Sequence, residues 1–145
     1  MPSWLQRAFF LLASTLLLLP FPFSPLIGQD RGFPETAAER TDFRQTTGYD
    51  ELVAFLGEVT DGQPRMFLTS MGTSFEGRRI PLVVVGDVTG PSPEAVKASG
   101  KTRLYVQGGI HAGEISGKEA LLIILRELAA GEHSHWADSV VLLIA

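Results

Sequence analysis

Residues 108–120, Gly-Gly-Ile-His-Ala-Gly-Glu-Ile-Ser-Gly-Lys-Glu-Ala, are the stretch of sequence that decides the fold. An apolar run, residues 104–106, comes before this stretch, and a leucine-rich run, residues 121–130, comes after it. The pattern predicts a glycine-rich loop between the carboxyl end of a strand and the N-terminus of a helix. In open α/β sheets, binding sites are built at that position.

His111 and Glu114 stand three positions apart in this loop. An imidazole nitrogen and a carboxylate oxygen at this spacing can converge on one cation, and zinc takes both kinds of ligand at roughly 2.0–2.2 Å. The glycines of the loop allow the backbone to turn tightly and to approach an ion. We also expect Ser116 to cap the helix, with Glu119 completing a capping box. Spacing alone leaves a second interpretation open, in which both side chains of the pair only face water.

The same stretch closely resembles the first metal-binding motif of the zinc carboxypeptidases, the carboxypeptidase A-like metallopeptidases. Upstream, residues 72–82, Gly-Thr-Ser-Phe-Glu-Gly-Arg-Arg-Ile-Pro-Leu, resemble the segment that precedes this motif in the family. The resemblance runs from about Gly48 to Ala145. It implies that His111 and Glu114 are two of three protein ligands of a Zn²⁺ cofactor, and that the substrate is a peptide.

The reaction implied by this resemblance is hydrolysis of a C-terminal peptide bond by metal-activated water. In the family, the third zinc ligand, the proton-shuttling Glu and the substrate-carboxylate site come from later segments. We therefore expect residues 48–145 to be the N-terminal part of a zinc carboxypeptidase-like catalytic domain. We expect this chain to hold no catalytic residue of its own, to bind zinc poorly alone and to be inactive alone.

Two further histidines, His133 and His135, follow the far end of the predicted helix. A helix over residues 117–130 is about 20 Å long at 1.5 Å per residue. Neither imidazole can then reach a metal ion that is held at the start of the helix. We expect both to be surface histidines in the connection between this helix and the next strand.

Two alternative functions remain at this point. One is a zinc-dependent deacylase of the aspartoacylase and succinylglutamate desuccinylase kind, because those enzymes also use a His-x-x-Glu pair. They usually lack a signal peptide, so the N-terminus of this chain favours the carboxypeptidase. The other is a non-catalytic, truncated relative, which the missing third ligand favours.

The composition excludes several classes of protein. The chain has 145 residues, 45% of them hydrophobic and 19% charged, which suits one small globular domain. Its formal net charge of −4 provides no basic face for a nucleic acid. It contains no cysteine, which excludes disulfides and thiolate metal ligands.

The N-terminus has the pattern of a secretory signal. Arg7 precedes a largely apolar core at residues 8–19, and three prolines follow that core within residues 20–25. We predict a signal peptide over residues 1–28, cleaved near Gly28, an extended leader over residues 29–47, and a secreted or otherwise extracytoplasmic protein. Contact with a membrane is then limited to the signal peptide. An uncleaved anchor, which is the alternative, needs about 20 apolar residues.

The remaining pattern predicts an α/β fold, with a mixed sheet flanked by helices, as an incomplete, zinc-carboxypeptidase-like domain. A helix with Asp50 as its N-cap is expected over residues 48–57. Residues 65–71 and 80–85 read as an antiparallel strand pair whose connection turns tightly at Glu76-Gly77-Arg78.

The second half of the chain predicts two more strands. Residues 102–107 form the strand before the loop, and residues 94–98 form a short helical turn before that strand. Residues 139–145 are almost entirely apolar, as in a strand covered on both faces. Because no further strand follows residue 145 to pair with this one, we expect residues 140–144 to be more exposed than their sequence warrants.

Overall fold

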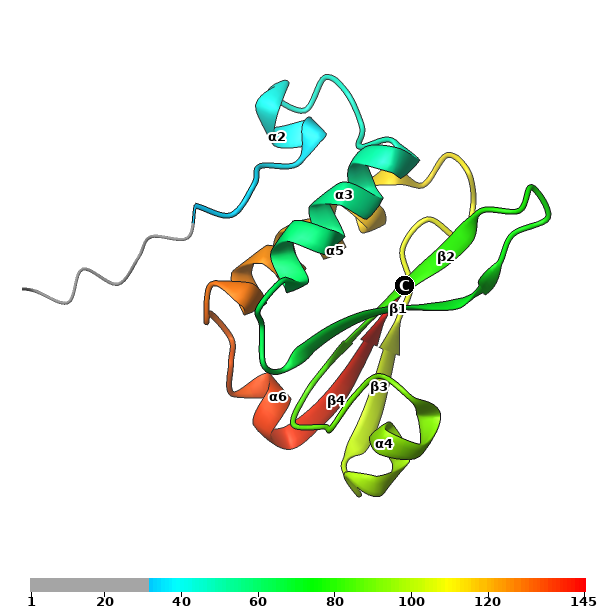
Figure 1. The fold of residues 1–145 in the computed structure, drawn as a ribbon. Helices are drawn as coiled ribbons and strands as arrows, with labels where there is room; N and C mark the ends of the chain where they lie inside the picture. Colours follow the sequence, from blue (N-terminus) through cyan, green and yellow to red (C-terminus); the bar gives the residue numbers. More distant parts are fainter. Residues whose placement is uncertain (1–31) are drawn as a thin grey trace, which may run out of the picture. The chain divides into compact units, whose positions relative to one another are not determined.

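The computed structural model describes residues 32–145, so the predicted signal peptide, residues 1–28, lies outside the described residues. A four-stranded mixed sheet, with the strand order β1-β2-β4-β3, forms the centre of the described part (Figure 1). β2 pairs antiparallel with both β1 and β4, whereas β4 and β3 pair parallel. This confirms the predicted mixed sheet. The strands are β1 (Met66–Thr73), β2 (Arg79–Val85), β3 (Thr102–Val106) and β4 (Val140–Ile144).

Helices cover both faces of this sheet (Figure 1). α3 and α5 pack on one face, and the short α4 packs on the other. Within residues 32–145, no helix is long and apolar enough to cross a membrane. The helices are α2 (Ala37–Arg40), α3 (Tyr49–Thr60), α4 (Pro93–Ala98), α5 (Ile115–Ala129) and α6 (Trp136–Ser139).

The core has two parts because strand side chains alternate between the two faces of the sheet. The larger part lies under α3 and α5, where Leu122 and Leu125 of α5 pack with Leu142 of β4. The smaller part lies under α4, where Val96 packs with Val141 of β4. β4 therefore contributes to both parts, as its apolar sequence predicts.

The expectation that residues 140–144 would be exposed is wrong. β4 lies between β2 and β3, so both of its edges are paired. Val141 is fully buried, and Leu142 and Ile144 are each only 5% exposed. The exposed apolar strand is β3 at the edge of the sheet, where Leu104 is 50% and Tyr105 46% exposed.

The connection between β1 and β2 is the tight turn that the sequence predicts. Gly77 has a φ of +80°, which glycine adopts readily. The amide of Gly77 donates to the carbonyl of Ser74 at 2.9 Å, and the amide of Ser74 donates to the carbonyl of Arg78 at 2.8 Å. Arg78 also pairs with Glu76 at 3.3 Å within this turn.

α3 begins earlier than the sequence suggests. Its N-cap is Gly48 rather than Asp50, which lies in the first turn of the helix. The amide of Leu52 donates to the carbonyl of Gly48 at 2.8 Å, and the carboxylate of Glu51 accepts from the amide of Gly48 at 3.3 Å. The carboxylate at the third helical position thus replaces a capping side chain at the N-cap.

The described part of the predicted leader, residues 32–47, is not simply extended. It contains α2, whose N-cap Thr36 forms a capping box with Glu39. The same Glu39 carboxylate accepts two hydrogen bonds of 2.6 Å from the guanidinium of Arg126 in α5. This segment is therefore attached to the helix that follows the candidate metal loop. A leader that ends at residue 47 stays a prediction.

Candidate metal centre

Backbone hydrogen bonds fix the start of the loop between β3 and α5. Gly108 donates its amide to the carbonyl of Ala145 at 2.9 Å, and Ala145 donates to the carbonyl of Val106 at 3.0 Å. A Cβ atom on Gly108 would lie 2.9 Å from both the Cα and the amide nitrogen of Lys118, so only glycine fits this crossing without a shift of the backbone. The predicted strand, loop and helix are all present.

His111 and Glu114 meet within this loop. The Nδ1 atom of His111 lies 3.0 Å from Oε1 of Glu114. The amide of Glu114 donates to the carbonyl of His111 at 3.0 Å, so one tight turn places the two side chains together. Both are open to solvent, with 76% of the His111 side chain and 63% of the Glu114 side chain exposed.

This pair fits the coordination chemistry of zinc. Two ligands in a tetrahedral zinc site, each about 2.1 Å from the ion, lie about 3.4 Å apart. The observed separation of 3.0 Å needs only a small side-chain adjustment to reach this value. Within residues 32–145, no third His, Asp or Glu side chain converges on the pair. His133 and His135 follow the opposite end of α5.

The predicted capping box at the start of α5 is wrong. The N-cap is Glu114, which makes no side-chain capping hydrogen bond, and Ser116 lies inside the first turn. Glu119 points elsewhere, toward Thr46 and Thr47. The helix starts earlier than expected because the tight turn from His111 leads directly into it.

Glu119 is buried, and its carboxylate takes part in a hydrogen-bond network instead of the predicted capping box. Its carboxylate accepts hydrogen bonds from the Thr46 hydroxyl at 2.6 Å, the Thr47 amide at 2.7 Å and the Thr47 hydroxyl at 2.8 Å. Lys118 lies 3.1 Å from it and also donates to the Thr47 carbonyl. Burial opposes ionisation, but these hydrogen bonds hold the pKa of Glu119 below its ordinary value.

One signal in the sequence could have identified this role. Glu119 lies three residues before Leu122, on the same face of α5 as the buried leucines. A carboxylate within an apolar stripe needs hydrogen-bond donors when it is buried. The network attaches residues 46 and 47 to the first turns of α5, directly after the metal loop.

A cavity of about 390 Å³ lies beside the loop. Gly108 and Gly109 form part of its wall, and the turn between β1 and β2 contributes Ser74 and Arg78. His111 and Glu114 are not among its lining residues. The pair therefore lies on an open surface near this cavity rather than inside it.

Comparison with known proteins relates the loop to a family. The family model for zinc carboxypeptidases matches residues 52–144, which include the whole loop and its flanking elements. A search of curated proteins finds no match.

Solved carboxypeptidase structures share the fold. The chain aligns with carboxypeptidase A from Helicoverpa armigera at 22% identity and a TM-score of 0.57, covering 69% of this chain and 24% of that one. It aligns with thrombin activatable fibrinolysis inhibitor at 17% identity and a TM-score of 0.55, covering 69% and 24%. It aligns with a metallo-carboxypeptidase from Burkholderia cenocepacia at 20% identity and a TM-score of 0.55, covering 69% and 26%.

The chain thus spans about a quarter of the length of the solved structures it matches. At these identities, the structural likeness shows the fold alone. The family model, in contrast, matches most of the described residues through their sequence. On this match, the chain belongs to the zinc carboxypeptidase family.

Proposed function

We propose that this chain forms the N-terminal part of a zinc metallocarboxypeptidase and that His111 and Glu114 are two of its zinc ligands. The observation that carries the proposal is the 3.0 Å approach of His111 Nδ1 to Glu114 Oε1 in the loop between β3 and α5. These are donor types that zinc takes in hydrolytic sites. Membership of the family supplies the reaction, hydrolysis of a C-terminal peptide bond.

The residues of the chain have defined tasks in this proposal. His111 and Glu114 present a nitrogen and an oxygen at the surface, where a peptide has access. Gly108 holds the loop against α5, and Glu119 attaches residues 46 and 47 to the same helix. When bound, zinc polarises the scissile carbonyl and activates a water molecule.

The third ligand and the catalytic groups are proposed to lie outside residues 32–145. Catalytic zinc sites generally have three protein ligands, and only two converge at this loop. The chain also spans about a quarter of the structures it matches. We accordingly expect the isolated chain to have no peptidase activity.

Export is part of the same proposal. Residues 1–28 combine Arg7, an apolar core and helix-breaking prolines, which is the pattern of a cleaved secretory signal. The mature N-terminus of exported protein should then lie near Gln29. N-terminal sequencing tests this, and recovery of intact Met1 in a membrane fraction would contradict cleavage.

The ligand assignment is tested by replacing His111 with Ala in the full-length protein. Removing a ligand should cost at least the 10–100-fold loss of metal affinity that is typical when a supporting residue around a metal site is changed. We expect tightly bound zinc to fall by one equivalent and peptide hydrolysis to be lost. Glu114→Gln keeps the shape but removes the charge, and it should also weaken zinc binding strongly.

His135→Ala is the matched control, because it removes an imidazole at the opposite end of α5. Metal content is measured by atomic absorption after dialysis, and turnover is measured on a blocked dipeptide. Unchanged zinc content and turnover in the His111→Ala protein would show that the assignment is wrong.

A further inference from the structure

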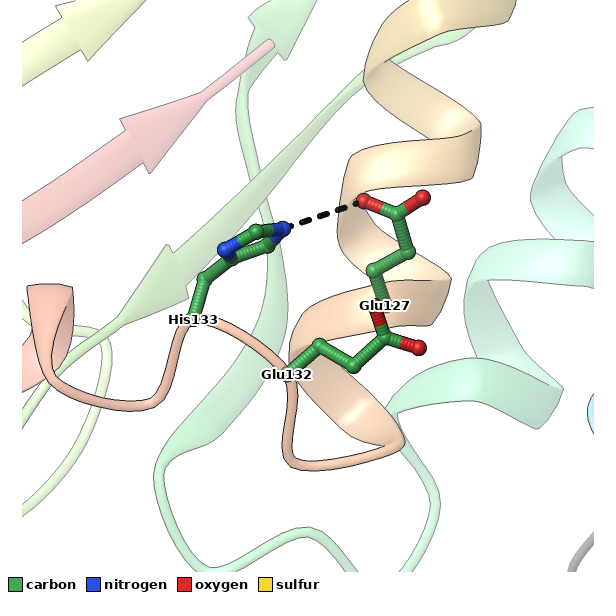
Figure 2. A group of neighbouring side chains, drawn as sticks. All are labelled: Glu127, Glu132 and His133. Carbon is green, nitrogen blue, oxygen red and sulfur yellow. Dashed lines mark ion pairs between the residues drawn. The ribbon is translucent and has the colours of Figure 1, made fainter.

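A second group of metal-ligating side chains lies at the other end of α5. Glu127 belongs to the last turn of the helix, and Glu132 and His133 belong to the loop that follows it (Figure 2). One ligand atom from each side chain lies within 4.8 Å of the other two. The three side chains come together on the same side of the helix end (Figure 2).

The backbone brings the two carboxylates together. Gly131 has a φ of +91° and donates its amide to the carbonyl of Leu128 at 3.1 Å. The amide of Glu132 donates to the carbonyl of Glu127 at 2.9 Å. These two bonds define a Schellman motif, the common way in which a helix ends at glycine. Glu127 and Glu132 are therefore neighbours for a reason that does not depend on their side chains.

The residue types at these two positions are unusual for the motif. The two side chains that a Schellman motif brings together frequently form an apolar contact. Here both are glutamates, so two negative charges repel each other at short range. The negative end of the helix dipole lies at the same place and increases the local negative potential. The fold thus concentrates negative charge where a cation would relieve it.

His133 adds a nitrogen donor whose orientation is fixed. Its φ of +53° turns the chain back toward α5, and its Nε2 atom lies 3.5 Å from Oε2 of Glu127 (Figure 2). Its ring stacks on Trp136 of α6, with ring centroids 4.5 Å apart and an interplanar angle of 14°. The imidazole is therefore held between the end of one helix and the start of the next.

We propose that Glu127, Glu132 and His133 form a binding site for a divalent transition-metal ion of the zinc type. Two carboxylate oxygens and one imidazole nitrogen suit zinc, cobalt or nickel, whereas calcium and magnesium select all-oxygen sites. Ligand atoms of a tetrahedral ion lie about 3.4 Å apart, so rotation of the two glutamates would close the site. The side chain of Glu127 is about a third exposed and Glu132 is exposed, so both have room for this movement.

Such an ion would join the end of α5 to the loop that enters α6 and β4. The site is separate from His111 and Glu114, because α5 is about 20 Å long and the two groups lie at its opposite ends. Its role is structural: it stabilises the connection that places β4 in the sheet. The competing interpretation is a simple ion pair between His133 and Glu127, with Glu132 in solvent.

Zinc binding distinguishes the two interpretations. The experiment uses the full chain carrying His111→Ala, so that the loop before α5 keeps only one of its two proposed ligands. Zn²⁺ is titrated in competition with a chromophoric chelator. We expect one zinc to bind per chain, and we expect Glu132→Gln and His133→Ala each to weaken binding at least 10-fold. Ca²⁺ should not compete.

His135→Ala is the matched control. Its imidazole lies two residues further on in the same loop and also contacts Trp136, at 6.1 Å between ring centroids, but it is not part of the group. Zinc affinity should stay within about twofold of the parent chain, because no ligand is lost. A loss as large as that from His133→Ala would overturn the proposed ligand set.

Thermal unfolding provides a second readout that does not depend on the His133 ring. Glu132→Gln keeps the shape of the side chain and removes one of the two repelling charges. Without metal, the melting temperature should therefore be unchanged or higher, whereas the rise in melting temperature on adding zinc should disappear. A simple ion pair predicts no response to zinc in either protein. Failure of the His111→Ala chain to bind zinc, or zinc binding that Glu132→Gln leaves intact, would overturn the proposal.

Discussion

Gly108 is a residue at which the candidate metal loop lies against the backbone of α5. Any larger residue would place its Cβ 2.9 Å from the backbone of Lys118, and no flexible side chain is present there to move aside. Gly113 lies in the same loop, but a Cβ at that position would meet no atom within 4 Å. The two glycines of one loop are thus under very different steric constraints.

Replacing Gly108 by Ala should therefore separate the loop from the helix. Forcing an extra methyl group into a packed site typically costs about 1–3 kcal/mol of unfolding free energy. Gly113→Ala serves as the control and should change the free energy by less than about 0.5 kcal/mol, as surface substitutions usually do. Urea titration of both variants measures the difference. Equal stability of the two variants would contradict the close approach of Gly108 to the backbone of Lys118.

Glu119 shows the limit of sequence reasoning at the level of single residues. The loop and the approach of His111 to Glu114 could be predicted because glycine spacing and side-chain spacing are local, and their role as metal ligands stays a prediction. The partners of Glu119 are Thr46 and Thr47, which lie more than seventy positions earlier in the chain. Its spacing from Ser116 suggested a capping box instead, because local patterns contain no information about distant donors.

The pairing of α2 with α5 is the clearest electrostatic contact between elements. The hydrogen bonds from Arg126, together with those from the amide and hydroxyl of Thr36, lower the pKa of Glu39 from 4.5 to about 2 against the effect of burial. Each of the two side chains is 20% exposed. A carboxyl whose pKa is lower in the folded state stabilises the fold above its unfolded pKa, by about 3 kcal/mol in this case. This stabilisation is lost as the pH falls through the folded pKa.

The pH dependence of the unfolding free energy of the Glu39→Gln variant should show the contribution of the Glu39–Arg126 pair directly. At pH 7 the variant should be less stable than the parent by about 3 kcal/mol, because Arg126 loses its charged partner. The difference should shrink between about pH 5 and pH 2, as Glu39 of the parent becomes protonated. Chemical denaturation at several pH values measures both curves.

Glu51→Gln is the control for this experiment. Glu51 pairs with Arg40 at 3.1 Å, but both side chains are about half exposed. Exposed pairs contribute about 0–1 kcal/mol, so the variant should show little pH-dependent difference from the parent. A difference for Glu39→Gln that stays constant from pH 7 to pH 2 would exclude the ion pair as its cause.

Helices and strands with a clear pattern of apolar residues could be predicted from the sequence. The way in which they pack against one another could not. The leucines of α5 and the apolar run of β4 give clear local signals, and both elements form within two residues of the expected bounds. The exposure of β4 was predicted wrongly because sheet order is a long-range property. No local pattern indicates that β4 enters between β2 and β3 rather than at an edge.

For the molecule as a whole, the exposed edge at β3 has the largest consequence. Leu104 and Val106 line an open apolar hollow of about 420 Å³, together with Trp136 and residues of α5 and β4. Unpaired backbone groups on an edge strand can pair with another chain, and exposed apolar side chains add to that tendency. The described chain should therefore associate with itself through β3.

A lysine at position 104 should reduce this association, because a charge on an edge strand opposes edge-to-edge pairing. Val53→Lys adds the same charge on a helix, α3, rather than on β3, and Val53 is 38% exposed. Sedimentation velocity over a range of concentrations should show less association for Leu104→Lys than for Val53→Lys. Equal association of the two variants would place the contact elsewhere.

The central position of β4 in the sheet also affects the order in which the strand pairings form during folding. β1 and β2 form a local hairpin, but β4 pairs with β2 across more than fifty residues. Pairings over such sequence distances form late, because a long loop must close first. Since Gly108 donates a hydrogen bond to Ala145 at the end of β4, the loop that carries His111 and Glu114 acquires this backbone partner only when β4 inserts. During synthesis, the segment that holds the candidate ligands leaves the ribosome well before the contact that fixes its shape.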